Sequence, residues 1–227
     1  NKMRKYFILF LIIISFCFGE KDMYNIKLYG INVAQCHVDA IDTTINNSEY
    51  IKLKYKVSSS SIMKWIFNVD NYYETIIDKK TFDIFYFKKN TYQPKVTNLC
   101  ETILINDSVK YQNSQYSIND GEYNIFSLLY LLSVNQNNLN QINLDREGKK
   151  YLCSIDFQPD IESYTLEFNQ IDENDNGLIL DTDIFTWALF LDDTIKTIKV
   201  NPVENKIDFC RFKKGLMNFV AKRVEPN

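Results

Sequence analysis

The amino-acid sequence predicts a mainly β protein, built as one large curved antiparallel sheet that forms an incompletely closed barrel with one short buried helix. Three observations support this fold class. Apolar and polar residues alternate along several stretches, Asn, Asp and Gly residues separate these stretches, and one Leu-rich run breaks the alternation. A period of two is typical of strands with one solvated face, which usually belong to antiparallel sheets. The 227 residues, 45% of them hydrophobic, suffice for one large core, so we expect a single domain.

Residues 1–19 have the layout of a cleavable secretory signal peptide. Lys2, Arg4 and Lys5 precede an uncharged, almost entirely apolar run over residues 6–18, and Cys17 and Gly19 are the small residues before the expected cleavage point. This run is too short to span a bilayer comfortably. We therefore expect a signal peptide at residues 1–19 and one β-rich bacterial envelope domain at residues 20–227. The protein would be periplasmic or otherwise extracytoplasmic, and it would keep no stable membrane span after cleavage.

Charge argues against one class of partner. Removal of residues 1–19 leaves 23 basic and 29 acidic residues, a net charge of −6 where the full chain has −3. An acidic domain repels phosphate backbones, so a nucleic-acid partner is not expected.

The clearest strand signal lies in residues 50–57. Ile51, Leu53, Tyr55 and Val57 fall on one face, and three lysines fall on the other. This alternation predicts a strand whose lysine face is solvated. Further strands are expected at residues 25–33, 74–78, 81–88, 102–105, 149–157, 164–168, 185–191 and 194–200.

One segment departs from the strand pattern. Residues 124–133 are nearly all apolar and Leu-rich, and they follow an Asp120-Gly121 turn. This composition favours a short buried helix. A single apolar helix needs cover on most sides, so we expect it against the concave face of the sheet. The Asn- and Gln-rich residues 135–143 are expected to form a loop.

Four stretches resemble a known family. They are residues 28–34, residues 69–75 with Asp78 and Thr81, residues 124–130, and residues 187–193 followed by Ile198, Val200 and Pro202. In them the chain resembles the exported bacterial family known as domain of unknown function 3108, over about Tyr24 to Arg223. The resemblance implies an extracytoplasmic β-rich fold, akin to the lipoprotein-carrier (LolA/LolB-like) open barrel, and a closing hairpin at the last of the four stretches. It implies no established activity.

Four cysteines remain after residue 19: Cys36, Cys100, Cys153 and Cys210. An oxidising compartment permits disulfides among them, and small buried thiols are an equal alternative.

Residues 172–183 have the spacing of a calcium-binding loop. Asp172, Asn174, Asn176 and Asp183 occupy ligand positions 1, 3, 5 and 12, and Gly177 stands at the tight turn. Calcium requires several converging oxygen ligands around a sharply turned backbone. Because Asp, Asn and Gly are also ordinary turn residues, a plain surface loop is the alternative.

Catalytic machinery is not evident in the sequence. His37 is the one histidine, and no nucleophile motif or phosphate-binding loop accompanies it. Asp70, Glu74 and Asp78 recur at a spacing of four, which could pair carboxylates on a helix but places them far apart along a strand. We therefore expect no enzyme, with an envelope hydrolase as the alternative.

Aromatic and Leu residues supply candidates for a ligand-facing surface. They are Trp65, Phe67, Tyr72, Tyr73, Leu128, Leu129 and Leu131. Our first hypothesis is a non-enzymatic envelope protein that binds an apolar ligand, such as an acyl chain, or a partner's hydrophobic segment in an open barrel. The alternatives are an envelope scaffolding or interaction protein with a packed barrel, and a weak calcium-binding envelope protein.

Overall fold

The computed structural model describes residues 21–105, 108–111, 114–117, 121–134, 139–171 and 183–225. The expected signal peptide at residues 1–19 lies outside the described residues. Within these ranges the strands are β1 (Lys21–Leu28), β2 (Ile31–Ile45), β3 (Ser48–Ser59), β4 (Asp70–Asp78), β5 (Ile84–Gln93), β6 (Val96–Ile105), β7 (Ser108–Tyr111), β8 (Ser114–Ser117), β9 (Glu122–Tyr123), β10 (Gln141–Arg146), β11 (Lys149–Gln158), β12 (Ser163–Gln170), β13 (Ile195–Asn201), β14 (Lys206–Lys214) and β15 (Met217–Arg223). The helices are the 3₁₀ turns η1 (Met63–Trp65) and η2 (Pro159–Ile161) and the α-helices α2 (Ile125–Val134) and α3 (Ile184–Leu189).

All of these strands belong to one sheet, in the order β8-β7-β6-β5-β4-β3-β2-β1-β15-β14-β13-β12-β11-β10-β9. The strands pair antiparallel, except that β9 runs parallel to β10. The first and last strands meet in the middle, where Tyr24 on β1 lies opposite Arg223 on β15. The outermost strands β8 and β9 are not paired with each other, so the barrel is incompletely closed. The predicted fold class is therefore confirmed.

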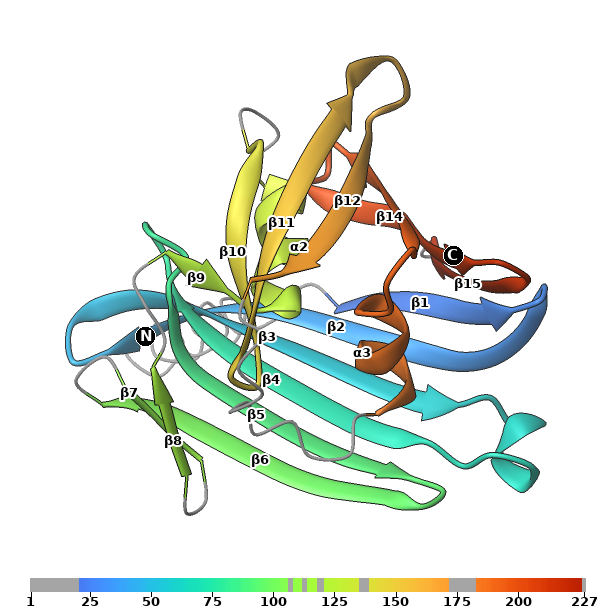
Figure 1. Ribbon diagram of the computed structural model, residues 1–227, viewed down its shortest axis with the longest axis horizontal. Coiled ribbons are helices and arrows are strands. Elements are labelled where there is room, and N and C mark those ends of the chain that lie inside the picture. Colours follow the sequence, from blue (N-terminus) through green and yellow to red (C-terminus); the bar gives the residue numbers. More distant parts are fainter. Residues whose placement is uncertain are drawn as a thin grey trace, which may run out of the picture.

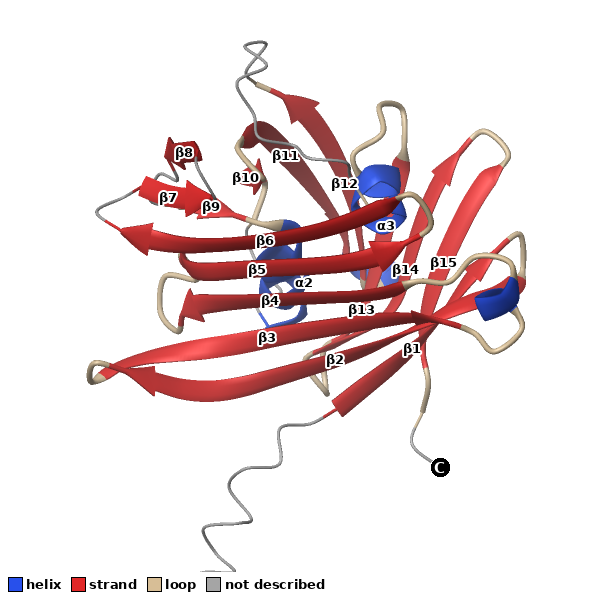
Figure 2. Ribbon diagram, turned by 90° about the horizontal axis from the view of Figure 1, so that it is seen from below, coloured by secondary structure: helices blue, strands red, loops and turns tan. Residues whose placement is uncertain are grey.

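The curvature of the sheet encloses α2. Figures 1 and 2 show β2–β6 on one side and β10–β14 on the other, with α2 between them. The helix packs against β14, β10, β13 and β4. Among the described residues, no helix combines the length and hydropathy that are needed to cross a bilayer.

The alternation in β3 determines which face is inside. Ile51, Leu53, Tyr55 and Val57 are all buried, and the lysines between them lie on the outer face. The register brings Lys54 beside Asp39 of β2 and Glu74 of β4 on that outer face. Opposite charges in neighbouring strands stabilise this pairing, so the outer face contributes to register as well as to solvation.

The predicted helix at residues 124–133 is confirmed as α2. Its start is fixed by a reciprocal cap, in which Asn124 Oδ1 accepts from the Ser127 amide at 2.8 Å and Ser127 Oγ accepts from the Asn124 amide at 3.0 Å. The ring of Phe126 lies 4.9 Å from the ring of Tyr55 and 4.6 Å from that of Tyr73, measured between centroids. These contacts hold the helix against the concave face of the sheet.

Three local expectations need correction. The strand expected at residues 185–191, and with it the hairpin implied by the family resemblance, is wrong, because α3 occupies Ile184–Leu189. The Asp183 carboxylate caps this helix by accepting from the amides of Phe185 and Thr186. The expected strand at residues 25–33 is divided by a turn at Tyr29 and Gly30, both with positive φ. The expected loop at residues 135–143 ends earlier, because β10 begins at Gln141.

Candidate functional site: an apolar cavity inside the open barrel

A cavity of about 620 Å³ lies inside the curved sheet. Its walls come from β1, β2, β3, β4, β14 and β15, together with one face of α2 and one face of α3. The lining side chains include Tyr24, Ile26, Cys36, Val38, Ile51, Leu53, Tyr55, Val57, Tyr73, Phe126, Leu129, Tyr130, Phe185, Leu189, Ile207, Cys210, Phe212 and Ala221. Most of these side chains are apolar, and the cavity falls within the size range of small-molecule sites, about 300–1,000 Å³.

The strand periodicity explains the sheet wall of this cavity. Along β2, Cys36 and Val38 point inward while His37 between them is exposed on the outer face. The helix wall arises because α2 packs mainly toward β14, β10, β13 and β4, and its first turn meets β3 where Phe126 packs on Tyr55. Leu128 and Leu132 fill that contact with no exposed surface, whereas Leu129 faces the cavity. The open space is therefore the part of the concave face that α2 leaves uncovered.

Several hydroxyl groups of the cavity wall are bonded within the protein. Tyr24 donates its hydroxyl proton to the Ile207 carbonyl at 2.8 Å, and Tyr55 donates to the Phe126 carbonyl at 3.1 Å. Ser133 donates to the Tyr130 carbonyl at 2.7 Å. Because these donors are already used, they offer little to a polar ligand group.

Burial also keeps tyrosine and cysteine side chains of the wall uncharged. Desolvation raises the pKa of Tyr24 and of Tyr55 far above the ordinary tyrosine value. The same cause raises the pKa of Cys36 and of Cys210 to about 12. These thiols therefore stay protonated at neutral pH, and the interior presents an uncharged surface.

Charged residues lie at one rim of the cavity. Asp22 pairs with Lys206 at 3.1 Å, and Asp42 pairs with Lys79 at 3.0 Å. Glu204 pairs with Arg223, which also bonds Asp208. The rim therefore combines both signs of charge around an apolar interior.

A buried ion network joins α3 to the sheet beside the cavity. Lys89 on β5 is 1% exposed, and its ammonium lies 2.6 Å from Glu147 in the β10–β11 turn and 3.0 Å from Asp183 at the start of α3. Burial alone would raise the pKa of Asp183, but Lys89 and the donors of Thr186 outweigh it and hold that pKa below its usual range. The network fixes α3 against β5, and α3 in turn places Phe185 and Leu189 at the cavity wall.

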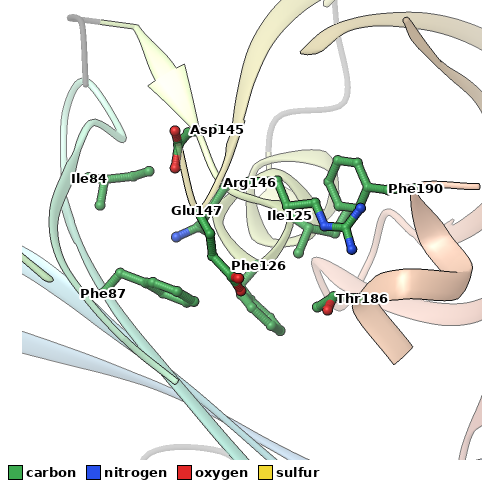
Figure 3. A pocket seen from close by; sticks show the side chains of 10 residues that line it. Ile84, Phe87, Ile125, Phe126, Asp145, Arg146, Glu147, Thr186 and Phe190 are labelled. Carbon is green, nitrogen blue, oxygen red and sulfur yellow. The ribbon is translucent and has the colours of Figure 1, made fainter. Parts of the chain in front are cut away.

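A second, much smaller pocket of about 20 Å³ lies next to this network (Figure 3). The guanidinium of Arg146 extends toward Phe190, with its central carbon 4.7 Å from the centroid of that ring. Arg146 Nε is buried without a hydrogen-bond partner. The space suffices for about one water molecule, so this pocket is too small for an organic ligand.

The predicted ligand-facing residues are divided among three places. Tyr73 and Leu129 line the cavity, whereas Leu128 and Leu131 are buried in the core. Trp65 and Phe67 lie in the β3–β4 loop, and Tyr72 on the outer face of β4 bonds Glu74.

Most of the cavity wall was not identified from the sequence. Tyr24 and Ile26 on β1 belong to it, as do Ile207 and Phe212 on β14. The alternation of β1 could have indicated the first pair, but β14 carries no comparable signal.

The four cysteines are free thiols in this structure. Cys36 and Cys210 line the cavity from β2 and β14, while Cys100 and Cys153 are buried elsewhere in the core. The free-thiol alternative therefore describes this structure.

The expected calcium loop lies largely outside the described residues, including Asp172, Asn174 and Asn176. Asp183 is described, and its carboxylate is engaged by Lys89 and by the first amides of α3. Within the described ranges, no group of three or more His, Cys, Asp or Glu side chains could hold a metal ion.

The groups considered for catalysis lie on the outer side of the sheet. His37 is exposed between the inward-facing Cys36 and Val38. Asp78 accepts from the amides of Lys80 and Thr81, and these bonds hold its pKa below the usual value. Asp78 therefore acts as a turn cap at the end of β4.

Comparisons with known proteins identify a protein of similar fold. No protein-family model matches the chain, and no curated protein matches it significantly, so the resemblance to domain of unknown function 3108 is not confirmed. The crystal structure of a beta-barrel-like protein of domain of unknown function DUF1849 from Brucella abortus is similar, with a TM-score of 0.51 and 10% sequence identity. The similarity covers 90% of this chain and 95% of that one. The chain therefore shares a β-barrel-like fold with a protein whose domain has no known function.

Proposed function

We propose that this protein is a non-enzymatic binding protein that holds an apolar chain, such as the acyl chain of a lipid, in the cavity between α2 and the β1–β3 wall. The observation that carries this proposal is the cavity itself, about 620 Å³ with a mainly apolar lining. Burial of apolar ligand surface in such a space is favourable at about 25 cal/mol per Å². The proposal favours a ligand-binding barrel over a packed scaffolding barrel.

The chemistry of the wall defines which part of a ligand fits. The hydroxyls of Tyr24 and Tyr55 are bonded to backbone carbonyls, so a buried polar ligand group would find few partners and would lose its hydration. An unbranched hydrocarbon chain has no polar group, so it loses no hydrogen bond to water in the same position. A polar head group is better placed at the rim, where Asp22, Lys206 and Glu204 are found.

Export to the bacterial envelope is part of the proposal. It is supported by the positive, apolar and small-residue zones of residues 1–19. In that compartment a carrier of an apolar chain would shield it from water between membranes or between proteins.

The proposal can be tested with one pair of variants on β2. Val38 faces the cavity and His37, its neighbour, faces outward. We expect the purified domain to bind a fluorescent fatty acid, and we expect Val38→Trp to weaken that binding by at least about tenfold because the indole occupies space that the ligand needs in the cavity. His37→Trp should bind as the wild type does.

Native mass spectrometry of the protein purified from its own envelope provides an independent check. A lipid-sized mass that is lost in Val38→Trp and kept in His37→Trp supports the proposal. An unliganded mass, together with equal fatty-acid binding by both variants, refutes it.

A further inference from the structure

Three loops meet at one end of the barrel. They are the β1–β2 turn, the β3–β4 loop at residues 60–69, and the β14–β15 turn. The Ser60 amide donates to the Val33 carbonyl at 3.0 Å, which joins the β3–β4 loop to β2. On the other side, the Tyr29 amide donates to the Asn218 carbonyl at 3.3 Å, which joins the β1–β2 turn to β15. Figure 2 shows the 3₁₀ turn of the β3–β4 loop at this end, beyond the ends of β3 and β4.

These loops display large apolar side chains to solvent. Trp65 is 93% exposed and Leu216 is 90% exposed. The apolar loop cluster, as we call this set, consists of Tyr29, Ile31, Ile62, Trp65, Ile66 and Leu216, and each member is more than half exposed. Exposed apolar groups of this size mark sites of interaction with a protein or a membrane.

The β3–β4 loop is held rigid while its apolar side chains stay exposed. Ser59 Oγ donates to the Phe67 carbonyl at 2.7 Å and accepts from the Val69 amide at 2.8 Å. The Lys64 amide donates to the Ser60 carbonyl at 3.0 Å. These bonds give the loop a defined conformation, in which Trp65 is exposed.

The charges on the three loops are all of one sign. Residues 26–34, 59–69 and 212–219 contain Lys27, Lys64, Lys213 and Lys214 and no acidic residue, although the whole chain has a net charge of −3. Lysine is depleted at protein–protein interfaces. Lysine next to exposed Trp, Tyr, Ile and Leu is instead typical of surfaces that bind anionic lipid.

We propose that the apolar loop cluster docks the protein onto an anionic lipid bilayer. Trp65 and Tyr29 suit the boundary between head groups and hydrocarbon, and Ile62, Ile66 and Leu216 enter the hydrocarbon edge. The four lysines lie close to lipid phosphates. This docking does not depend on a ligand in the cavity, and it orients the barrel with the β1–β2, β3–β4 and β14–β15 loops toward the membrane.

Trp65 makes the docking directly measurable. The sequence has two tryptophans, Trp65 and Trp187, so the Trp187→Phe protein reports on Trp65 alone. We expect its emission to shift to shorter wavelength when vesicles of phosphatidylglycerol and phosphatidylcholine are added, and the protein to sediment with them. Pure phosphatidylcholine vesicles should bind more weakly, and added salt should reduce binding to the anionic vesicles.

Two variants of the loop and one matched control locate the contact. The triple variant Ile62→Ser, Trp65→Ser, Ile66→Ser should sediment with anionic vesicles at least about tenfold less, because the inserted apolar area is lost. Lys64→Glu should bind several-fold less. Val203→Ser removes an equally exposed apolar residue from the β13–β14 turn, at the opposite end of β14, and should bind as the wild type does.

Circular dichroism and thermal unfolding establish that each variant is folded, which is expected because every changed side chain is exposed. The proposal is overturned if the wild type ignores anionic vesicles, or if the triple variant binds them equally well. It is also overturned if the Trp65 emission shift depends on protein concentration rather than on lipid, since that result identifies the cluster as a contact between copies of the chain.

Discussion

Lys89 is a charged side chain that is almost completely enclosed, between Glu147 and Asp183. Removal of one partner from a buried ion network leaves the opposite charge desolvated and unpaired. We expect Lys89→Met to lower the free energy of unfolding by about 3–5 kcal/mol, measured by urea denaturation. Lys88→Met, one position along β5 and on the outer face, should lower it far less.

A second substitution distinguishes lost charge balance from lost packing. If the cost of Lys89→Met arises from the unpaired carboxylate, then the double variant Lys89→Met, Asp183→Asn should recover part of the stability. Equal losses in the single and double variants would contradict this account.

Asp145 should give the protein a pH dependence between mild acid and neutrality. Burial raises its pKa from 3.8 to about 6, despite the attraction of Lys150. Between these two values the folded state keeps a proton that the unfolded state has released, so stability falls as the pH rises through this window and is constant above it. We expect Asp145→Asn to remove up to about 2–3 kcal/mol of this difference, since one pKa unit corresponds to about 1.4 kcal/mol.

The measurement is the free energy of unfolding in urea at about pH 4.5 and about pH 7, because these values lie inside and above the window. The wild type should lose more stability than Asp145→Asn on going to the higher pH. Parallel behaviour of the two proteins would show that Asp145 does not retain its proton in the folded state.

At the scale of single elements, α2 depends on its first turn. Asn124 and Ser127 bond each other's backbone, and Asn124 Nδ2 also donates to Thr75 Oγ1 of β4 at 3.1 Å. We expect Asn124→Ala to cost about 1–2 kcal/mol, the range of a lost helix cap. Because the two residues form one reciprocal cap, Ser127→Ala should cost less in the Asn124→Ala background than in the wild type. Additive losses in thermal or urea denaturation would argue against a coupled cap.

The elements differ in how much of them the sequence could reveal. The strand β3 and the helix α2 were predictable, because an alternating stretch and a Leu-rich run each match one structure. The helix α3 was not, since a short apolar run around Trp187 suits a strand equally well, and the decisive feature is the capping carboxylate of Asp183. The cavity was only partly predictable, because its width depends on how far α2 stands from β2 and β3.

At the scale of the whole molecule, the junction of β1 and β15 holds the two halves of the sheet together. Strands β2–β8 extend from β1 and strands β14–β9 extend from β15. We expect deletion of residues 217–225 to abolish cooperative thermal unfolding, because β1 and β14 each lose one of their two neighbouring strands. A circular permutant keeps the pairing of β1 with β15 and changes only the order of the chain. It links residue 225 to residue 21 and opens the exposed turn at Asn46 and Asn47, which have positive φ. This permutant should keep the native fold. A cooperative transition in the truncated chain would contradict this role of β15.

The same junction has a consequence for biosynthesis. A chain that emerges from its amino-terminal end can form β1–β8 early, but the free edge of β1 must wait for a strand made about two hundred residues later, since Tyr24 pairs with Arg223. Contacts of such long sequence separation form slowly, and an unpaired strand edge is a template for aggregation. Until β15 is made, the edge of β1 therefore stays open to pairing with a strand of another chain.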